Sequence, residues 1–124
     1  LHSFPTRRSS DLLRQVAEQS EDTELRAVAA VRRARVLIEL GKPDDAIALL
    51  KPDAAGAFTG VQQDVRGDAY FAKGDMEAAR VAYAAALAAE PALAPDARQI
   101  VELKLQDLAA EAGAAAPAQE QAAQ

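Results

Sequence analysis

Few side chains of this 124-residue chain could carry out chemistry, and they do not combine into a catalytic set. Cysteine is absent, which excludes a disulfide framework, a thiolate metal site and a cysteine nucleophile. The single histidine is His2, and Ser20 is the only serine beyond residue 12. A hydrolase or transferase needs a nucleophile and base within reach, a metal or a phosphate cradle, and Gly56, Gly60 and Gly67 do not follow a phosphate-loop pattern. We therefore expect a protein that is not an enzyme, with no catalytic, cofactor-binding or metal-binding residue.

The carboxylates have simple structural interpretations. Asp44 and Asp45 lie at a predicted helix start, where the helix dipole favours negative charge, and we interpret them as caps in preference to metal ligands. Glu102 and Asp107 fall on the last predicted helix and are expected to be solvated.

The amino-acid composition limits the remaining classes of function. Half of the residues are apolar, enough for one small domain with a modest core. The net charge of −5 argues against nucleic-acid binding, which needs clustered cations. Charged residues or glycine interrupt every apolar run before the roughly 20 residues of a membrane span. We expect no nucleic-acid partner and no membrane contact by this stretch itself.

Residues 1–12, LHSFPTRRSSDL, have neither the period of a strand nor that of a helix. All twelve resemble one reading frame of a widely used sequencing adapter. We expect them to be an unstructured artefact, so that His2, Arg7 and Arg8 have no functional role and the native amino terminus is missing. The alternative is a natural Ser/Arg-rich tail.

Helical periodicity dominates residues 13–112, the expected folded domain. A partial helix is predicted at 13–19, and Ser20–Thr23 are expected to end it and to cap a helix over 24–40. Apolar residues at three- and four-residue spacing place one side of that helix in a core: Leu25, Val28, Val31, Ala34, Leu37, Ile38 and Leu40. A shorter helix over 44–50 follows it.

Three further helices are predicted at 61–73, 76–90 and 96–111, between segments rich in glycine and proline. We interpret the last of them as a solvating cap on the helices before it. Residues 113–124 have no large apolar side chain to bury and are expected to be disordered or only transiently helical. No segment has a strand pattern, so the predicted class is all-α.

An internal repeat appears when the chain is aligned with itself at an offset of 33 residues. Five pairs of similar residues then coincide: Ala34 with Gly67, Leu37 with Tyr70, Gly41 with Gly74, Ala46 with Ala79 and Leu50 with Tyr83. The chain is predicted to contain two helix pairs, a partial helix before them and a capping helix after them.

The second unit resembles the tetratricopeptide pattern of small, aromatic, glycine and proline positions. These positions are Gly67, Tyr70, Gly74, Ala79, Tyr83, Ala86 and Pro91. The small residues let two helices approach closely, the tyrosines fill the space between them, and Gly74 and Pro91 end helices. The first unit departs from the pattern at Ala30, Arg33 and Asp53 and lacks the final proline.

Three stretches, 25–50, 66–83 and 100–108, are similar to the C-terminal half of the ancillary SecYEG translocon subunit family. The resemblance extends over about residues 13–108. It implies a bacterial inner-membrane protein with one N-terminal membrane span and a periplasmic repeat domain that binds proteins. The implied partners are the translocon, a periplasmic folding factor and newly exported chains. The span and the first repeat are expected to be absent here.

Stacked helix pairs form a curved surface, and the first helix of each pair lines its concave side. On that geometry six residues are predicted to bind a partner: Arg35, Ile38, Glu39, Asp64, Asp68 and Phe71. Arg35 and Asp68 are equivalent in the repeat, so a surface salt bridge between them is an alternative role. Tyr70 and Tyr83 are expected in the core.

Two other functions stay open from the sequence. The chain could be a generic tetratricopeptide scaffold of another envelope or cell-division assembly. It could also be the appendage of an enzyme whose catalytic part lies in the missing N-terminal sequence.

Overall fold

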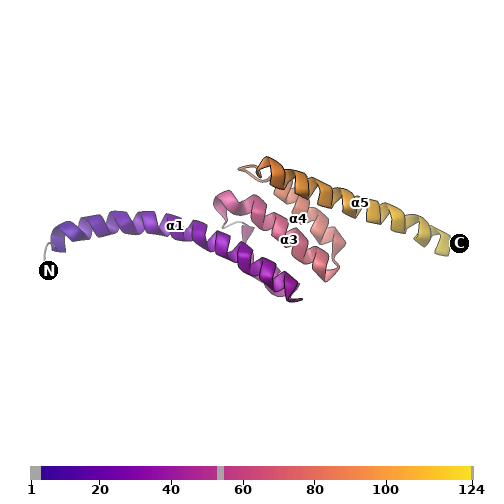
Figure 1. Ribbon diagram of the computed structural model, residues 1–124, viewed down its shortest axis with the longest axis horizontal. Helices are drawn as coiled ribbons and strands as arrows, with labels where there is room; N and C mark the ends of the chain where they lie inside the picture. Colours follow the sequence, from indigo (N-terminus) through magenta and orange to yellow (C-terminus); the bar gives the residue numbers. More distant parts are fainter. Residues whose placement is uncertain (1–3, 53–54, 124) are drawn as a thin grey trace.

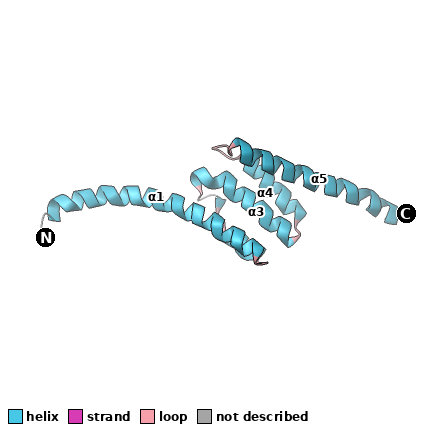
Figure 2. Cartoon of the chain, viewed as in Figure 1, coloured by secondary structure: helices cyan, strands magenta, loops and turns pink. Residues whose placement is uncertain are grey.

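The computed structural model describes the backbone of residues 4–52 and 55–123 and the side chains of residues 22–52 and 55–113. The described elements are α1 (Phe4–Glu39), α2 (Pro43–Leu49), the 3-10 helix η2 (Gly56–Phe58), α3 (Thr59–Lys73), α4 (Met76–Ala88) and α5 (Pro95–Ala123). Figure 2 shows helices and loops and no strand over the described backbone. The predicted all-α class is confirmed.

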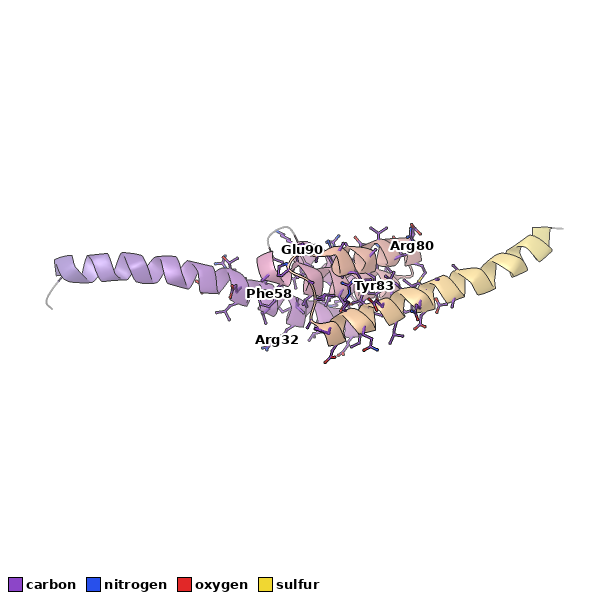
Figure 3. The ribbon with its side chains drawn as sticks, turned by 90° about the horizontal axis from the view of Figure 1, so that it is seen from above. Arg32, Phe58, Arg80, Tyr83 and Glu90 are labelled. Carbon is purple, nitrogen blue, oxygen red and sulfur yellow. The ribbon has the colours of Figure 1, made fainter. Side chains whose placement is uncertain are left out.

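The helices pack as neighbours in chain order. α1 packs against α2 and α3, α2 also packs against α3, and α3–α4 and α4–α5 follow. The first part of α1 and the last part of α5 extend beyond this packed centre in opposite directions, as the two perpendicular views agree (Figures 1 and 3). The molecule is therefore a short row of helix pairs, which is the architecture of a repeat solenoid.

The two helix turns repeat the same backbone hydrogen bonds 33 residues apart. Gly41 has φ 77° and Gly74 has φ 92°, a left-handed conformation that glycine adopts without a Cβ penalty. Each glycine N–H donates to the carbonyl three residues earlier, at 3.1 Å for Gly41 and 3.0 Å for Gly74. The following N–H, of Lys42 or Asp75, donates to the carbonyl five residues earlier, at 2.8 Å and 2.9 Å respectively. The repeat in the sequence is therefore a repeat in the structure.

Among the described side chains, two apolar clusters form the core, and many of their members are alanines, which allow close helix approach. The first cluster joins α1, α2 and α3 through Val31, Ala34, Ala46, Leu50, Val65 and Ala69. The second contains Ala79, Tyr83, Ala86, Leu93, Val101 and Leu108, from α4, the connector after it and α5. Val61 of α3 packs against both clusters and makes them continuous.

The residues that define the repeat lie at the helix contacts and turns. Ala34, Ala46, Ala79 and Ala86 are fully buried. Gly67 is buried, Leu37 and Tyr70 are half-buried, and Leu50 and Tyr83 lie in the core. Pro91, an exposed residue just past α4, follows a cis peptide bond. Figure 3 shows Tyr83 between the helices and Arg80 at the outside.

The structure differs from the sequence-based prediction at both ends. α1 is continuous from Phe4, so the predicted break at Ser20–Thr23 is wrong, and residues 4–12 are helical. Residues 6–39 contain neither glycine nor proline. Each Ser, Asp or Thr in a helix interior lowers helix stability, relative to alanine, by less than about 1 kcal/mol. α5 likewise continues to Ala123, because alanine, the strongest helix former, dominates that stretch. The adapter origin of residues 1–12 stays a prediction.

Some predictions fall outside the described part. Asp53 and His2 belong to the residues whose placement is not described, and the side chains of Arg7 and Arg8 are also outside it. Among the helices that are described, none combines the length and the apolar character needed to cross a bilayer.

Candidate protein-interaction site

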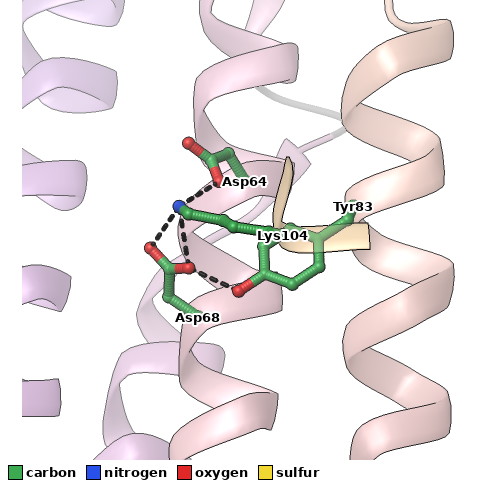
Figure 4. A network of polar contacts seen from close by, with 4 residues as sticks. All are labelled: Asp64, Asp68, Tyr83 and Lys104. Carbon is green, nitrogen blue, oxygen red and sulfur yellow. Dashed lines mark hydrogen bonds and ion pairs between the residues drawn. The ribbon is translucent and has the colours of Figure 1, made fainter. Parts of the chain in front are cut away.

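Lys104 of α5 reaches across to two carboxylates of α3. Its Nζ lies 2.9 Å from Oδ1 of Asp64 and 3.0 Å from Oδ1 of Asp68, and it donates to Oδ2 of Asp68 at 3.2 Å (Figure 4). Asp64 and Asp68 are four residues apart, which places them on the same face of α3. One ammonium group therefore joins the last helix to the middle of the repeat.

Burial and ion pairing act in opposite directions on the pKa values of Asp64 and Lys104. Asp64 is a buried residue, and desolvation raises its pKa although the hydrogen bond and charge of Lys104 act against the rise. Burial disfavours the charged form of Lys104, but its hydrogen bonds to Asp64 and Asp68 outweigh this and raise the pKa of the ammonium. Near neutral pH one cation thus serves two partly buried carboxylates.

Tyr83 of α4 completes the network from the other side. Its hydroxyl donates to Oδ1 of Asp68 at 2.5 Å, and Nζ of Lys104 lies 5.4 Å from its ring centroid (Figure 4). Burial, followed by the hydrogen bond and charge of Asp68, raises the pKa of Tyr83 well above its ordinary value. Three helices, α3, α4 and α5, meet at these four side chains.

A concave surface lies beside this network, and we name it the α3–α5 groove. Its lining comprises Asp68, Phe71, Tyr83, Lys104, Asp107, Leu108, Ala110 and Glu111. Phe71 is 44% exposed, although it is a large apolar side chain. Asp107 and Glu111 are exposed, and neither forms an ion pair within the part of the chain that the structure describes. The groove therefore combines an apolar floor with an acidic rim.

The structure brings together only some of the six predicted partner-binding residues. Asp68 and Phe71 line the α3–α5 groove. Asp64 is buried and engaged by Lys104. Arg35 and Glu39 are exposed on α1.

Ile38 has a different environment from the other predicted contacts. It is half-buried and packs against the first core cluster. Its side chain is therefore partly committed to the core.

The alternative role proposed for Arg35 is wrong. The cation that pairs with Asp68 among the described residues is Lys104, at 3.0 Å. Arg35 instead acts on Asp64. Its positive charge opposes the rise in the pKa of Asp64, as the smallest of several contributions. The physical reason is that α5 inserts a long side chain beside α3, and Lys104 reaches both carboxylates there.

Sequence reasoning missed the contribution of α5 to the site. Lys104, Asp107, Leu108 and Glu111 recur at three- and four-residue spacing, so they share one face of the helix. The spacing was a usable signal that these residues share a face, whereas the direction in which Lys104 points is known only from the structure. Asp107, expected to be solvated, is exposed and lines the groove.

A second hollow, the α1–α2 cleft, has the opposite charge. Its lining includes Arg26, Arg33 and Lys51 together with alanines, Leu49 and Gln62. Gln62 is 3% exposed, and its Nε2 donates to the carbonyl of Ala27 at 3.4 Å. None of the three cations forms an ion pair with a described carboxylate.

The remaining candidate groups have structural roles. Asp44 and Asp45 lie in the first turn of α2, whose N-cap residue is Lys42, and Asp44 pairs with Lys73 at 2.7 Å. Glu102 pairs with Arg98 at 3.4 Å. Within the described residues no three acidic or histidine side chains are placed to hold a metal ion.

Comparison with known proteins gives a family match and two similar relatives. The model of the tetratricopeptide repeat-like domain matches residues 6–110. The ancillary SecYEG translocon subunit of Aggregatibacter actinomycetemcomitans is 34% identical over 81% of this chain and 48% of its own length. The protein of the same name from Escherichia coli (strain K12) is 29% identical over 77% of this chain and 46% of its own length.

The chain thus spans about half the length of the curated relatives that it matches. No solved structure matches it significantly.

Proposed function

Because the chain belongs to the tetratricopeptide repeat-like domain family, we propose that it is a protein-interaction module and that the α3–α5 groove is its binding surface. The observation that carries this proposal is the exposure of Phe71 in a hollow between two helices. Isolated exposed apolar residues are common, but Phe71 lies in a groove whose lining includes the buried side chains of Tyr83 and Leu108. A polypeptide that packs on the exposed ring of Phe71 would therefore lie in a hollow.

The similarity to the two ancillary SecYEG translocon subunits supports a finer version of the proposal. In this version the domain acts beside the translocon as part of a membrane-anchored protein, with the repeat domain in the periplasm. It assists newly exported chains there, together with a periplasmic folding factor.

A binding experiment tests the proposal. The immobilised chain is offered purified SecYEG in detergent and, separately, a reduced and alkylated polypeptide that stays unfolded. Phe71→Ala is compared with Val81→Ala, since Val81 is 55% exposed on α4 and lies outside the groove. Both side chains are exposed, so both variants should keep the helical circular-dichroism spectrum of the wild type.

We expect the Phe71→Ala variant to lose about 5-fold or more in affinity, because the partner would bury this aromatic ring. The Val81→Ala variant should bind like the wild type. If neither probe binds, or if the two variants bind equally, the groove is not the interaction surface.

A further inference from the structure

We propose that the occupant of the α3–α5 groove is a polypeptide segment in which an arginine or lysine lies next to an apolar side chain. The inference rests on the proposed function and specifies the partner chemistry of that same site. It follows from three properties of the groove: the pairing state of its charges, the exposed ring of Phe71 and the contrast with the α1–α2 cleft.

The charge of the groove is not balanced within the described structure. Lys104 is shared by Asp64 and Asp68, so its positive charge is already compensated. Asp107 and Glu111, one turn apart on α5, have no cationic partner among the described residues. A bound cation would meet two free carboxylates, whereas a bound anion would meet repulsion from both.

The floor favours the same partner. The ring of Phe71 is 44% exposed, and an arginine or lysine can lay its aliphatic stem along such a ring while its charge lies over the face. Tyr83 already receives Lys104 in a similar way, with Nζ 5.4 Å from the ring centroid. The neighbouring apolar residue of the partner would then pack against Ala110, which is exposed and lines the same groove.

The α1–α2 cleft shows that acidity is a property of this groove and not of the whole surface. That cleft is lined by Arg26, Arg33 and Lys51, so it would repel the cationic segment that the groove attracts. It would also attract an acidic segment, and an experiment must therefore separate the two hollows.

Two matched peptides of about 12 residues test the inference by fluorescence anisotropy with the full chain. They share the same leucine and phenylalanine positions and differ only in carrying arginine or glutamate between them. A third peptide keeps the arginines and replaces the apolar residues by serine. Each is measured in the background Arg26→Gln/Arg33→Gln as well, which removes two charges of the α1–α2 cleft.

We expect the arginine peptide to bind about 5- to 20-fold more tightly than the glutamate peptide, because each of two exposed carboxylates contributes a modest attraction. The difference should shrink at high salt. The serine peptide should bind weakly, and the cleft variant should leave binding of the arginine peptide unchanged.

Variants of the rim decide whether the carboxylates act directly. Asp107→Asn/Glu111→Gln keeps the shape of the groove and should abolish the preference for arginine. Asp107→Lys/Glu111→Lys should reverse the preference toward glutamate, which a merely structural role would not do. Glu102→Gln is the matched control, because Glu102 lies on the same helix and pairs with Arg98 outside the groove.

The outcomes separate the two proposals. Equal binding of the arginine and glutamate peptides, or a preference that survives Asp107→Asn/Glu111→Gln, overturns the inference and leaves the interaction role standing. Absence of binding by every peptide and by the unfolded polypeptide overturns both.

Discussion

Gly67 and Tyr83 occupy one space between α3 and α4. A Cβ atom on residue 67 would lie 2.4 Å from Cε1 and 2.5 Å from Cδ1 of the Tyr83 ring. The ring has little freedom to move away, because it is 3% exposed and its hydroxyl is bonded to Asp68. The tetratricopeptide pattern of a small residue facing an aromatic one is thus explained by contact.

We therefore expect Gly67→Ala to destabilise the fold by about 1 to 3 kcal/mol, as overpacking does, despite the helix propensity that alanine adds. Gly113→Ala is the matched control, since a Cβ there meets nothing within 4 Å. It should gain up to about 1 kcal/mol. Urea denaturation followed by circular dichroism measures both, and equal effects of the two variants would contradict the contact.

Tyr83→Phe should change the response to alkali. The pKa of Tyr83 is raised in the folded state above its ordinary 10.0, so the folded chain holds the phenol proton more tightly than the unfolded chain. Below the ordinary value both states are protonated, so this group gives stability no dependence on pH there. As pH rises above it the unfolded state alone releases the proton, and stability is lost.

The Tyr83→Phe variant has no phenol proton to release, so its stability does not fall with pH for this reason. It should be less stable than the wild type by about 1 kcal/mol near neutral pH, because it lacks the hydrogen bond to Asp68. By about pH 11 the difference should narrow by about 1 kcal/mol. Lys104 and Lys73, whose pKa values are also raised, are present in both proteins and cancel in the comparison. A difference that stays constant or widens with pH would contradict the assigned environment of Tyr83.

At the scale of residues, the structural role could be predicted from the sequence where only a small residue fits the position. Glycine is needed at positions 41 and 74 because the turns there are left-handed. It is needed at position 67 because the Tyr83 ring approaches the backbone closely. The partner of Asp68 was not predictable in the same way. Lys104 is 36 residues away, and its reach depends on how α5 is oriented on α3.

At the scale of elements, α5 is held by more than its apolar face. Val101 and Leu108 bury it against α4, and Lys104 fastens it to α3. Removing the cation would leave the carboxylates of Asp64 and Asp68 close together, one of them buried, without compensation.

Lys104→Met should therefore cost about 2 kcal/mol of stability, since a buried carboxylate loses its partner while the apolar stem is kept. Lys73→Met removes the cation of a solvent-exposed pair with Asp44 and should change stability much less than Lys104→Met, because water and salt screen an exposed pair. Adding Asp64→Asn to Lys104→Met should restore part of the loss. Equal effects of the two lysine variants in thermal unfolding would show that the network stabilises nothing.

Element type was predictable and element ends were not. The periodicity of 24–40 and the Gly-Lys-Pro and Gly-Asp turns identified the helix pairs because each signal is local. The continuation of α1 through Ser20–Thr23 and of α5 beyond residue 112 was missed. Small polar residues favour a helix start without requiring one, so several consecutive residues of good helix propensity can override them.

At the scale of the whole molecule, two hollows of opposite charge have separate linings, with no residue in common. The α3–α5 groove has an acidic rim, and the α1–α2 cleft is lined by three cations. A repeat fold predicts that a concave surface exists, because stacked pairs curve. Which side chains line it depends on helix crossing and on the capping helix, and that is why the prediction found Asp68 and Phe71 but not the residues of α5.

Site-specific photo-crosslinking tests most directly whether partners bind in the α3–α5 groove. A benzophenone side chain replaces Phe71 or Ala110 inside the groove, or Val81 outside it, in the full chain mixed with SecYEG and an unfolded polypeptide. We predict adducts from positions 71 and 110 and little or none from 81. Equal adducts from all three positions, or adducts from 81 alone, would contradict the assignment of the groove as the binding surface.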